Sequence, residues 1–273
     1  MTPEEQLEWE SRNGRLAAIA AFASAILGVA GFIYYANTVG SYQDSADLLV
    51  AVHKHPAASI ASAVLSGLGV LLIMPVLAYL YTCTKYRRAE IPKIALYLVL
   101  IVPPIAALLS VITEVLQVHA ASQVHKELPL PPDLAVKRAD HFLKQGAAPV
   151  VGFAGFAASF GLAAGVAVIS LNAMRAGLLS RFMGILGVIL GFLFAIPIIV
   201  GPAIIQFFWM ISLALIFLNR WPGGRGPAWD AAEAIPWPSA AQQRAGTQAE
   251  PEPVAAAPPA HPTSKKRKRK RRH

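Results

Sequence analysis

Residues 182–219 read FMGILGVILGFLFAIPIIVGPAIIQFFWMISLALIFLN, a stretch without Asp, Glu, Lys or Arg. As one straight helix it would be about 57 Å long at 1.5 Å per residue, nearly twice the ~30 Å of bilayer hydrocarbon. Pro197, Gly201 and Pro202 lie near its middle, and proline suits the first turn of a helix but not its interior. We therefore predict two short spans that are joined by a turn at Gly201. The alternative is five spans with a re-entrant hairpin at the end.

Four more stretches without charged side chains come before it: Leu16–Tyr42, Pro56–Thr84, Ile94–Thr113 and Gly146–Met174. Each is long enough for one helix of about 20 apolar residues across a bilayer. Strands of membrane barrels are shorter, about ten residues of alternating polarity. The fold class predicted is all-α, an integral membrane bundle of six transmembrane helices within residues 16–219. The spans are expected near 16–38, 57–83, 94–117, 147–173, 182–200 and 203–219.

The composition of the whole chain agrees with a membrane protein. Of its 273 residues, 55% are hydrophobic and only 14% are charged, and the formal net charge is +9. Soluble domains carry about 25% charged residues. The single cysteine, Cys83, excludes a disulfide scaffold. These values argue against a disordered chain and against an ordinary cytosolic enzyme.

The distribution of cations predicts the topology, because short cytoplasmic loops carry the excess of Lys and Arg. Six spans with residues 1–15 in the cytoplasm place most cations near span ends on the inner side, and five spans would export the basic C-terminal run. We therefore expect a multi-pass protein of the bacterial inner membrane with both termini cytoplasmic. The inner cations are Arg12, Arg15, Lys85, Arg87, Arg88, Lys93, Arg175, Arg181, Arg220 and Arg225.

Two local patterns refine the bundle. Thr2-Pro-Glu-Glu5 has the form of a helix N-cap and predicts a short interfacial helix before the first span, with Leu7 and Trp9 toward lipid. Pro75, and Pro103 with Pro104, should kink the second and third spans.

Small residues at helical spacing predict close helix contacts within the bundle, or a homo-oligomer through one of these faces. They are Ala17, Ala20, Ala21, Ser24, Gly28 and Gly31 in the first span, Ser59, Ser62, Ser66 and Gly69 in the second, Gly161 and Gly165 in the fourth, and Gly184, Gly187 and Gly191 in the fifth.

The predicted outer side holds the few candidate site residues. Glu114, followed by Gln117 and His119, would form an ion or proton site of a permease, or would simply be a helix end at the headgroups. His53, His55 and His125 could bind a metal or respond to pH, although their spacing matches no zinc signature.

Catalytic motifs are absent from the sequence: it has no GxSxG, GxxxxGK[ST], CxxC or GxGxxG. Cys83 has no neighbouring base in the sequence and is expected to be a packed residue. We predict no cofactor and favour a non-enzymatic protein.

After Asn219 the chain changes character. Residues 220–227 leave the membrane with an interfacial Trp221, and residues 228–238, with Trp229 and Trp237, are expected to lie along the inner headgroups or against the inner loops. The rest of the tail, within 220–273, has a composition typical of disorder. It ends in eight consecutive basic residues: Lys265, Lys266, Arg267, Lys268, Arg269, Lys270, Arg271 and Arg272.

Three roles are open for this polybasic run: binding to the anionic inner leaflet or an acidic partner, non-specific binding to nucleic acid, or a solvated topology signal. Because the run is attached to membrane spans, the leaflet is always within its reach, which favours lipid binding. The leading prediction is thus a non-enzymatic membrane protein whose tail binds anionic lipid or an acidic partner. The alternatives are a permease that uses Glu114 and an outer-face metal or pH sensor.

Residues 171–187 (LNAMRAGLLSRFMGILG), 220–225 (RWPGGR), Pro227-Ala-Trp-Asp230 and Ala234-Ile-Pro-Trp-Pro238 resemble multi-pass membrane proteins of actinobacteria. Such proteins end in Pro/Ala-rich tails with a Lys/Arg run. The resemblance covers roughly the C-terminal 40% of the chain. It implies a location in the bacterial inner membrane, and it brings no activity, substrate or site residue.

Overall fold

The computed structural model describes residues 2–40, 42–127, 129–195, 201–222 and 224–237, all within one compact unit, Met1–Trp237. The polybasic run Lys265–Arg272 and residues 196–200 lie outside this part of the chain. The described residues form ten α-helices and no strand. The helices are α1 (Pro3–Thr38), α2 (Ser45–Lys54), α3 (Pro56–Leu71), α4 (Ile73–Arg87), α5 (Lys93–Glu127), α6 (Pro132–Leu143), α7 (Ala148–Ala176), α8 (Arg181–Ala195), α9 (Gly201–Phe217) and α10 (Ala228–Ala231).

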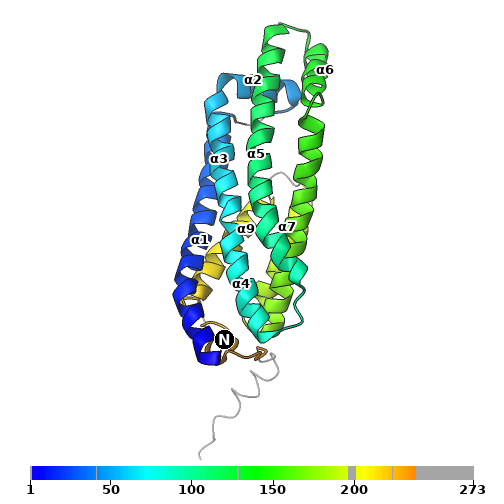
Figure 1. Cartoon of the computed structure of the whole chain (residues 1–273). Helices are drawn as coiled ribbons and strands as arrows, with labels where there is room; N and C mark the ends of the chain where they lie inside the picture. The colour runs from blue at the N-terminus through cyan, green and yellow to red at the C-terminus, as the bar shows by residue number, and fades with distance from the viewer. Residues whose placement is uncertain (1, 41, 128, 196–200, 223, 238–273) are drawn as a thin grey trace, which may run out of the picture. The chain divides into compact units, whose positions relative to one another are not determined.

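The long helices α1, α3 with α4, α5 and α7 lie side by side (Figure 1). The helix α8 packs along α7, and α9 packs along α1. We call the end that holds the start of α1, the end of α4 and α10 the basal end. The opposite end, where α2 and α6 pack against the last turns of α5, is the distal end. The cations predicted to be inner belong to the basal end.

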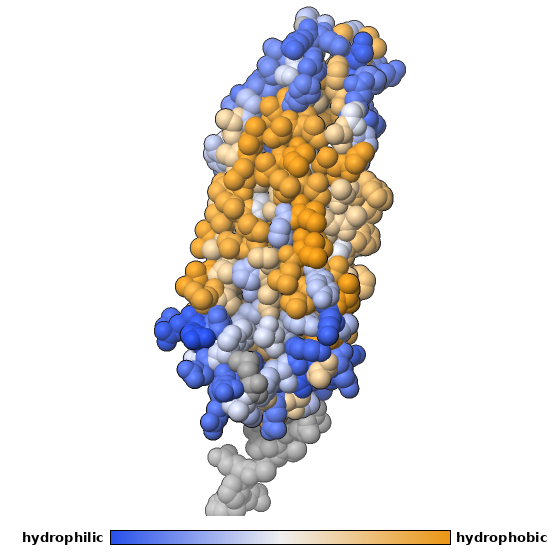
Figure 2. All heavy atoms as spheres, viewed as in Figure 1, coloured by the Kyte–Doolittle hydropathy of each residue, from blue (hydrophilic) through white to orange (hydrophobic). Residues whose placement is uncertain are grey.

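Large apolar side chains face outward between the two ends. Figure 2 shows this as an apolar band between polar ends. Soluble monomers rarely expose apolar patches above a few hundred Å², so a band of this kind is typical of a surface that faces lipid. Examples of its exposed residues are Leu16, Ile26, Leu108, Val150, Phe153, Phe192 and Ile204.

Four helical segments are long and apolar enough to cross a membrane: Pro3–Thr38, Pro56–Arg87, Lys93–Glu127 and Ala148–Ala176. The apolar helices α8, with 15 residues, and α9, with 17, would be about 22 and 25 Å long. Both are shorter than the ~30 Å of hydrocarbon. The two helices are in contact, since the indole N–H of Trp209 in α9 donates to the backbone oxygen of Met183 in α8 at 3.1 Å.

The predicted small-residue contacts are present inside the chain. Ser24 of α1 donates to the carbonyl oxygen of Gly69 in α3 at 2.7 Å. A Cβ atom added to Gly31 would lie 2.9 Å from the carbonyl oxygen of Ser62. On α8, a Cβ atom at Gly191 would lie 2.7 Å from the carbonyl oxygen of Ala163 in α7. Glycine at these places therefore lets the helix backbones approach closely.

Proline acts on two helices in different ways. The α3 helix ends at Leu71 and α4 begins at Ile73, so the second segment is broken just before Pro75, as predicted. Pro75 has no N–H to donate to the carbonyl of Leu71. In contrast, α5 remains one helix through Pro103 and Pro104.

The beginning of the chain differs from the prediction. Thr2 and Glu5 form the capping box that the sequence suggests. However, α1 continues without a break from Pro3 to Thr38, so there is no separate interfacial helix. Trp9 does not point only toward lipid, since its ring stacks on Tyr79 of α4 with 5.7 Å between centroids. The first turns of α1 thus belong to the bundle.

Candidate functional site

A buried ion pair joins α1 to α4 at the basal end. The guanidinium of Arg87 binds both carboxylate oxygens of Glu10, one of them at 3.0 Å. The side chains are 0% and 4% exposed, respectively. Two further side chains bind Glu10. Gln6 donates to one of its carboxylate oxygens at 2.7 Å, and the Tyr79 hydroxyl donates to its backbone oxygen at 2.9 Å. Burial of either charge alone would be costly, so each side chain needs the other and the surrounding hydrogen bonds to remain buried.

The same guanidinium also fixes the chain that follows α9. Arg87 donates through Nε to the backbone oxygen of Ala228 at 2.9 Å. Its Cζ atom lies 5.8 Å from the ring centre of Trp229. The indole N–H of Trp229 donates to the backbone oxygen of Leu178, in the α7–α8 turn, at 2.9 Å. We call residues 226–237 the basal strap, because these contacts hold them across the basal end. This agrees with the expected position against the inner loops.

Glycine is required where the strap crosses the α7–α8 turn. Gly177 has a φ of +84°, a backbone conformation that favours glycine, and a Cβ atom there would lie 2.7 Å from the carbonyl carbon of Ile235.

The predicted packing role of Cys83 fits its position, since the side chain is fully buried in the core next to these contacts.

A cavity of about 390 Å³ opens beside the strap at the basal end. Three of its lining residues are arginines from different elements: Arg88 follows α4, Arg175 is in the last turn of α7, and Arg181 begins α8. Trp237 from the end of the strap forms another part of the wall. The sequence places these arginines on the inner side but does not predict that they gather at one cavity.

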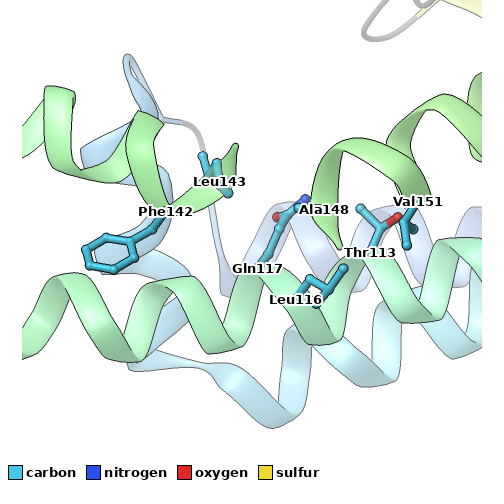
Figure 3. A pocket seen from close by; sticks show the side chains of 7 residues that line it. All are labelled: Thr113, Leu116, Gln117, Phe142, Leu143, Ala148 and Val151. Atoms are coloured by element: carbon cyan, nitrogen blue, oxygen red, sulfur yellow. The ribbon is translucent and has the colours of Figure 1, made fainter. Parts of the chain in front are cut away.

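At the distal end, the structure separates the residues that were expected to form one ion site. Glu114 is half-buried beside Ser59 of α3 and Tyr35 of α1. Gln117 instead lines a cavity of about 100 Å³ between α5, α6 and α7 (Figure 3). The exposed His119 lines a neighbouring cavity of about 330 Å³. The three side chains therefore do not converge, although one carboxylate oxygen of Glu114 is buried without a hydrogen-bond partner among the described residues.

The predicted histidine set is only partly assembled. The rings of His53 and His125 stack with 3.9 Å between centroids, which links α2 to α5. His55 lies between α2 and α3 and does not join them in a ligand set. Within the residues that the structure describes, no group of three or more His, Cys, Asp or Glu side chains could hold a metal ion. The metal-binding expectation therefore has no assembled site there.

The middle of the described bundle is filled by apolar and small side chains. The large core cluster includes Ala21, Leu77, Val166 and Leu213, all fully buried. These side chains pack the helices of the described bundle against one another. Comparison with protein-family models, with curated proteins and with solved structures finds no match to this chain.

Proposed function

We propose that this chain is a non-enzymatic protein of the bacterial inner membrane that crosses it six times, with both termini in the cytoplasm. The polybasic run Lys265–Arg272 binds anionic lipid of the inner leaflet. Four long apolar helices support the membrane location. The start of α8 and the end of α9 support the even number of crossings, because Leu178 before α8 and Phe217 at the end of α9 both contact basal-end residues. The resemblance to actinobacterial proteins supports the bacterial inner membrane.

The observation that carries the lipid-binding part is the basal strap. Its contacts with Arg87 and Leu178 hold the chain at the basal end as far as Trp237. A flexible segment of about 30 residues has a root-mean-square span of roughly 30 Å. If the segment predicted as disordered behaves in this way, the polybasic run stays within reach of the surface near the basal end. Each basic residue near an anionic leaflet contributes about 1 kcal/mol. An acidic protein partner would have to compete with the anionic leaflet, which is always within reach of the run.

The test uses the full chain in nanodiscs, with Cys83→Ala and His273→Cys for attachment of a fluorophore. We expect a headgroup quencher to reduce the fluorescence strongly when 30% of the lipid is anionic. This effect should be lost in high salt, because screening weakens surface electrostatics. The matched variant replaces Lys265–Arg272 by glutamine and should show little quenching. Equal quenching in neutral and anionic nanodiscs, or quenching that survives the glutamine replacement, would contradict lipid binding by the tail.

A further inference from the structure

The basal cavity has an unbalanced positive charge. Among the described residues, Arg175 and Arg181 form no ion pair, and Arg88 pairs only with Glu90, at 2.8 Å. No acidic side chain lines the cavity; its other walls are Met174, Ile185, Pro236 and Trp237. Three guanidinium groups around one space create a positive potential that attracts an anion.

Hydrogen-bond donors at this place are also unused. The Nε atom of Arg88 and the indole nitrogen of Trp237 are buried, and neither has a partner within the described residues. Buried polar groups are normally paired, so these two donors could bind an anion that enters the cavity. Trp237 thereby adds an uncharged donor to the three arginines.

The residues around the cavity indicate which kind of anion it would bind. Arginine forks match the oxygens of phosphate and bind them with charge-assisted hydrogen bonds. Ile185, which lines the cavity, is 53% exposed on α8. It continues the site into the apolar band, where acyl chains would lie.

We propose that the cavity lined by Arg88, Arg175 and Arg181 binds a phosphate group. The phosphate is carried by an anionic phospholipid of the inner leaflet or by a soluble phosphate compound. The lipid form rests on the proposed function, because it requires the basal end to lie at the inner leaflet. The site is distinct from the tail, because it is lined by Arg88 after α4, the end of α7, the start of α8 and the basal strap, whereas the polybasic run is a series of eight consecutive cations in the sequence.

The experiment measures binding by the purified full chain in detergent micelles. The probes are phosphatidylglycerol, phosphatidylcholine and inorganic phosphate. We expect phosphatidylglycerol to bind at least tenfold more tightly than phosphatidylcholine. The variant Arg175→Gln/Arg181→Gln should lose at least tenfold in affinity for phosphatidylglycerol. The matched control Arg12→Gln/Arg15→Gln removes two exposed cations from the basal part of α1 and should change it less than twofold.

Further variants separate this inference from the proposed tail function. The variant Arg175→Lys/Arg181→Lys keeps the charge but not the fork geometry, and should bind with intermediate affinity. The chain with Lys265–Arg272 replaced by glutamine should keep its pocket affinity. Equal affinity of wild type and Arg175→Gln/Arg181→Gln, with loss only in the tail variant, would overturn the pocket and leave the tail function intact. Binding of inorganic phosphate as tight as that of phosphatidylglycerol would assign the pocket to soluble phosphates.

Discussion

The variant Arg87→Met is expected to lower the free energy of unfolding by about 3–5 kcal/mol, because it leaves Glu10 buried without its counter-charge. The Glu10 side chain is only 4% exposed, so water cannot replace the guanidinium. The loss also removes the hydrogen bond to the backbone oxygen of Ala228. Unfolding of the purified protein in mixed micelles, followed by circular dichroism, measures the effect.

Two controls make this prediction specific to the buried pair. The exposed pair of Arg88 and Glu90 should contribute at most about 1 kcal/mol, so Glu90→Gln should be nearly neutral. The double variant Glu10→Leu/Arg87→Met should recover most of the lost stability, since an apolar pair leaves no uncompensated charge. A loss below 1 kcal/mol for Arg87→Met, equal to that of Glu90→Gln, would show that the pair does not hold the basal end.

The second large effect is expected from Trp229→Ala, which should cost about 3–5 kcal/mol, the usual range for a large aromatic residue in a core. Trp229 is 2% exposed and contacts Tyr79 and Phe217 as well as Arg87. Its removal leaves a cavity and breaks the bond to Leu178. The strap should then leave the basal end, and trypsin should cleave after Arg225 much faster than in the wild type.

The matched substitution is Trp221→Ala, because Trp221 is only partly buried and contacts the edge of Phe208. Trp221→Ala should lower the free energy of unfolding by less than half as much as Trp229→Ala does. It should leave the rate of trypsin cleavage after Arg225 nearly unchanged. Gly177→Ala should release the strap in the same way as Trp229→Ala, since its Cβ would collide with Ile235. Unchanged cleavage in both strap variants would mean that the strap is not held by these contacts.

Much of the fold follows from simple patterns in the sequence. Uncharged stretches of sufficient length predict the long helices, and Pro75 predicts the break between α3 and α4. The contact of Ser24 with Gly69 follows from small residues at helical spacing on two spans. These features are local, so that a single segment contains the signal. The helix α2 was not predicted, although Asp44 accepts the N–H of Asp47 at 2.9 Å and so caps it. That spacing is the signal that could have revealed the helix.

The ion pair of Glu10 and Arg87 was not predicted from the sequence, because its partners are far apart along the chain. One signal was present. Gln6 and Glu10 lie on the same helical stripe as Gly14, Ala17 and Ala21. A charged residue on the small-residue face of a span indicates a buried partner. The sequence pattern instead predicts an interfacial helix with Leu7 and Trp9 toward lipid.

The candidate site residues also depend on contacts between segments that are far apart along the chain. Arg88, Arg175 and Arg181 are all predicted at the inner ends of spans, and the structure places them around one cavity. Their convergence depends on the packing of α4 and α8 against α7, which no single segment of the sequence contains. At the distal end, the rings of His53 and His125 stack. Glu114 lies beside α1 and α3, whereas Gln117 lines a cavity with α6 and α7. Side-chain direction on a helix end is fixed by packing partners that the sequence alone does not identify.

The most direct test of the six-crossing topology is the reaction of single cysteines with an impermeant maleimide in right-side-out membrane vesicles. In a Cys83→Ala background, Lys144→Cys is at the distal end, Lys93→Cys is at the basal end, and Ile198→Cys lies between α8 and α9. We predict that Lys144→Cys and Ile198→Cys are labelled from outside and that Lys93→Cys reacts only after permeabilisation. Labelling of Lys93→Cys in sealed vesicles would contradict a cytoplasmic basal end, and protection of Ile198→Cys would contradict six crossings.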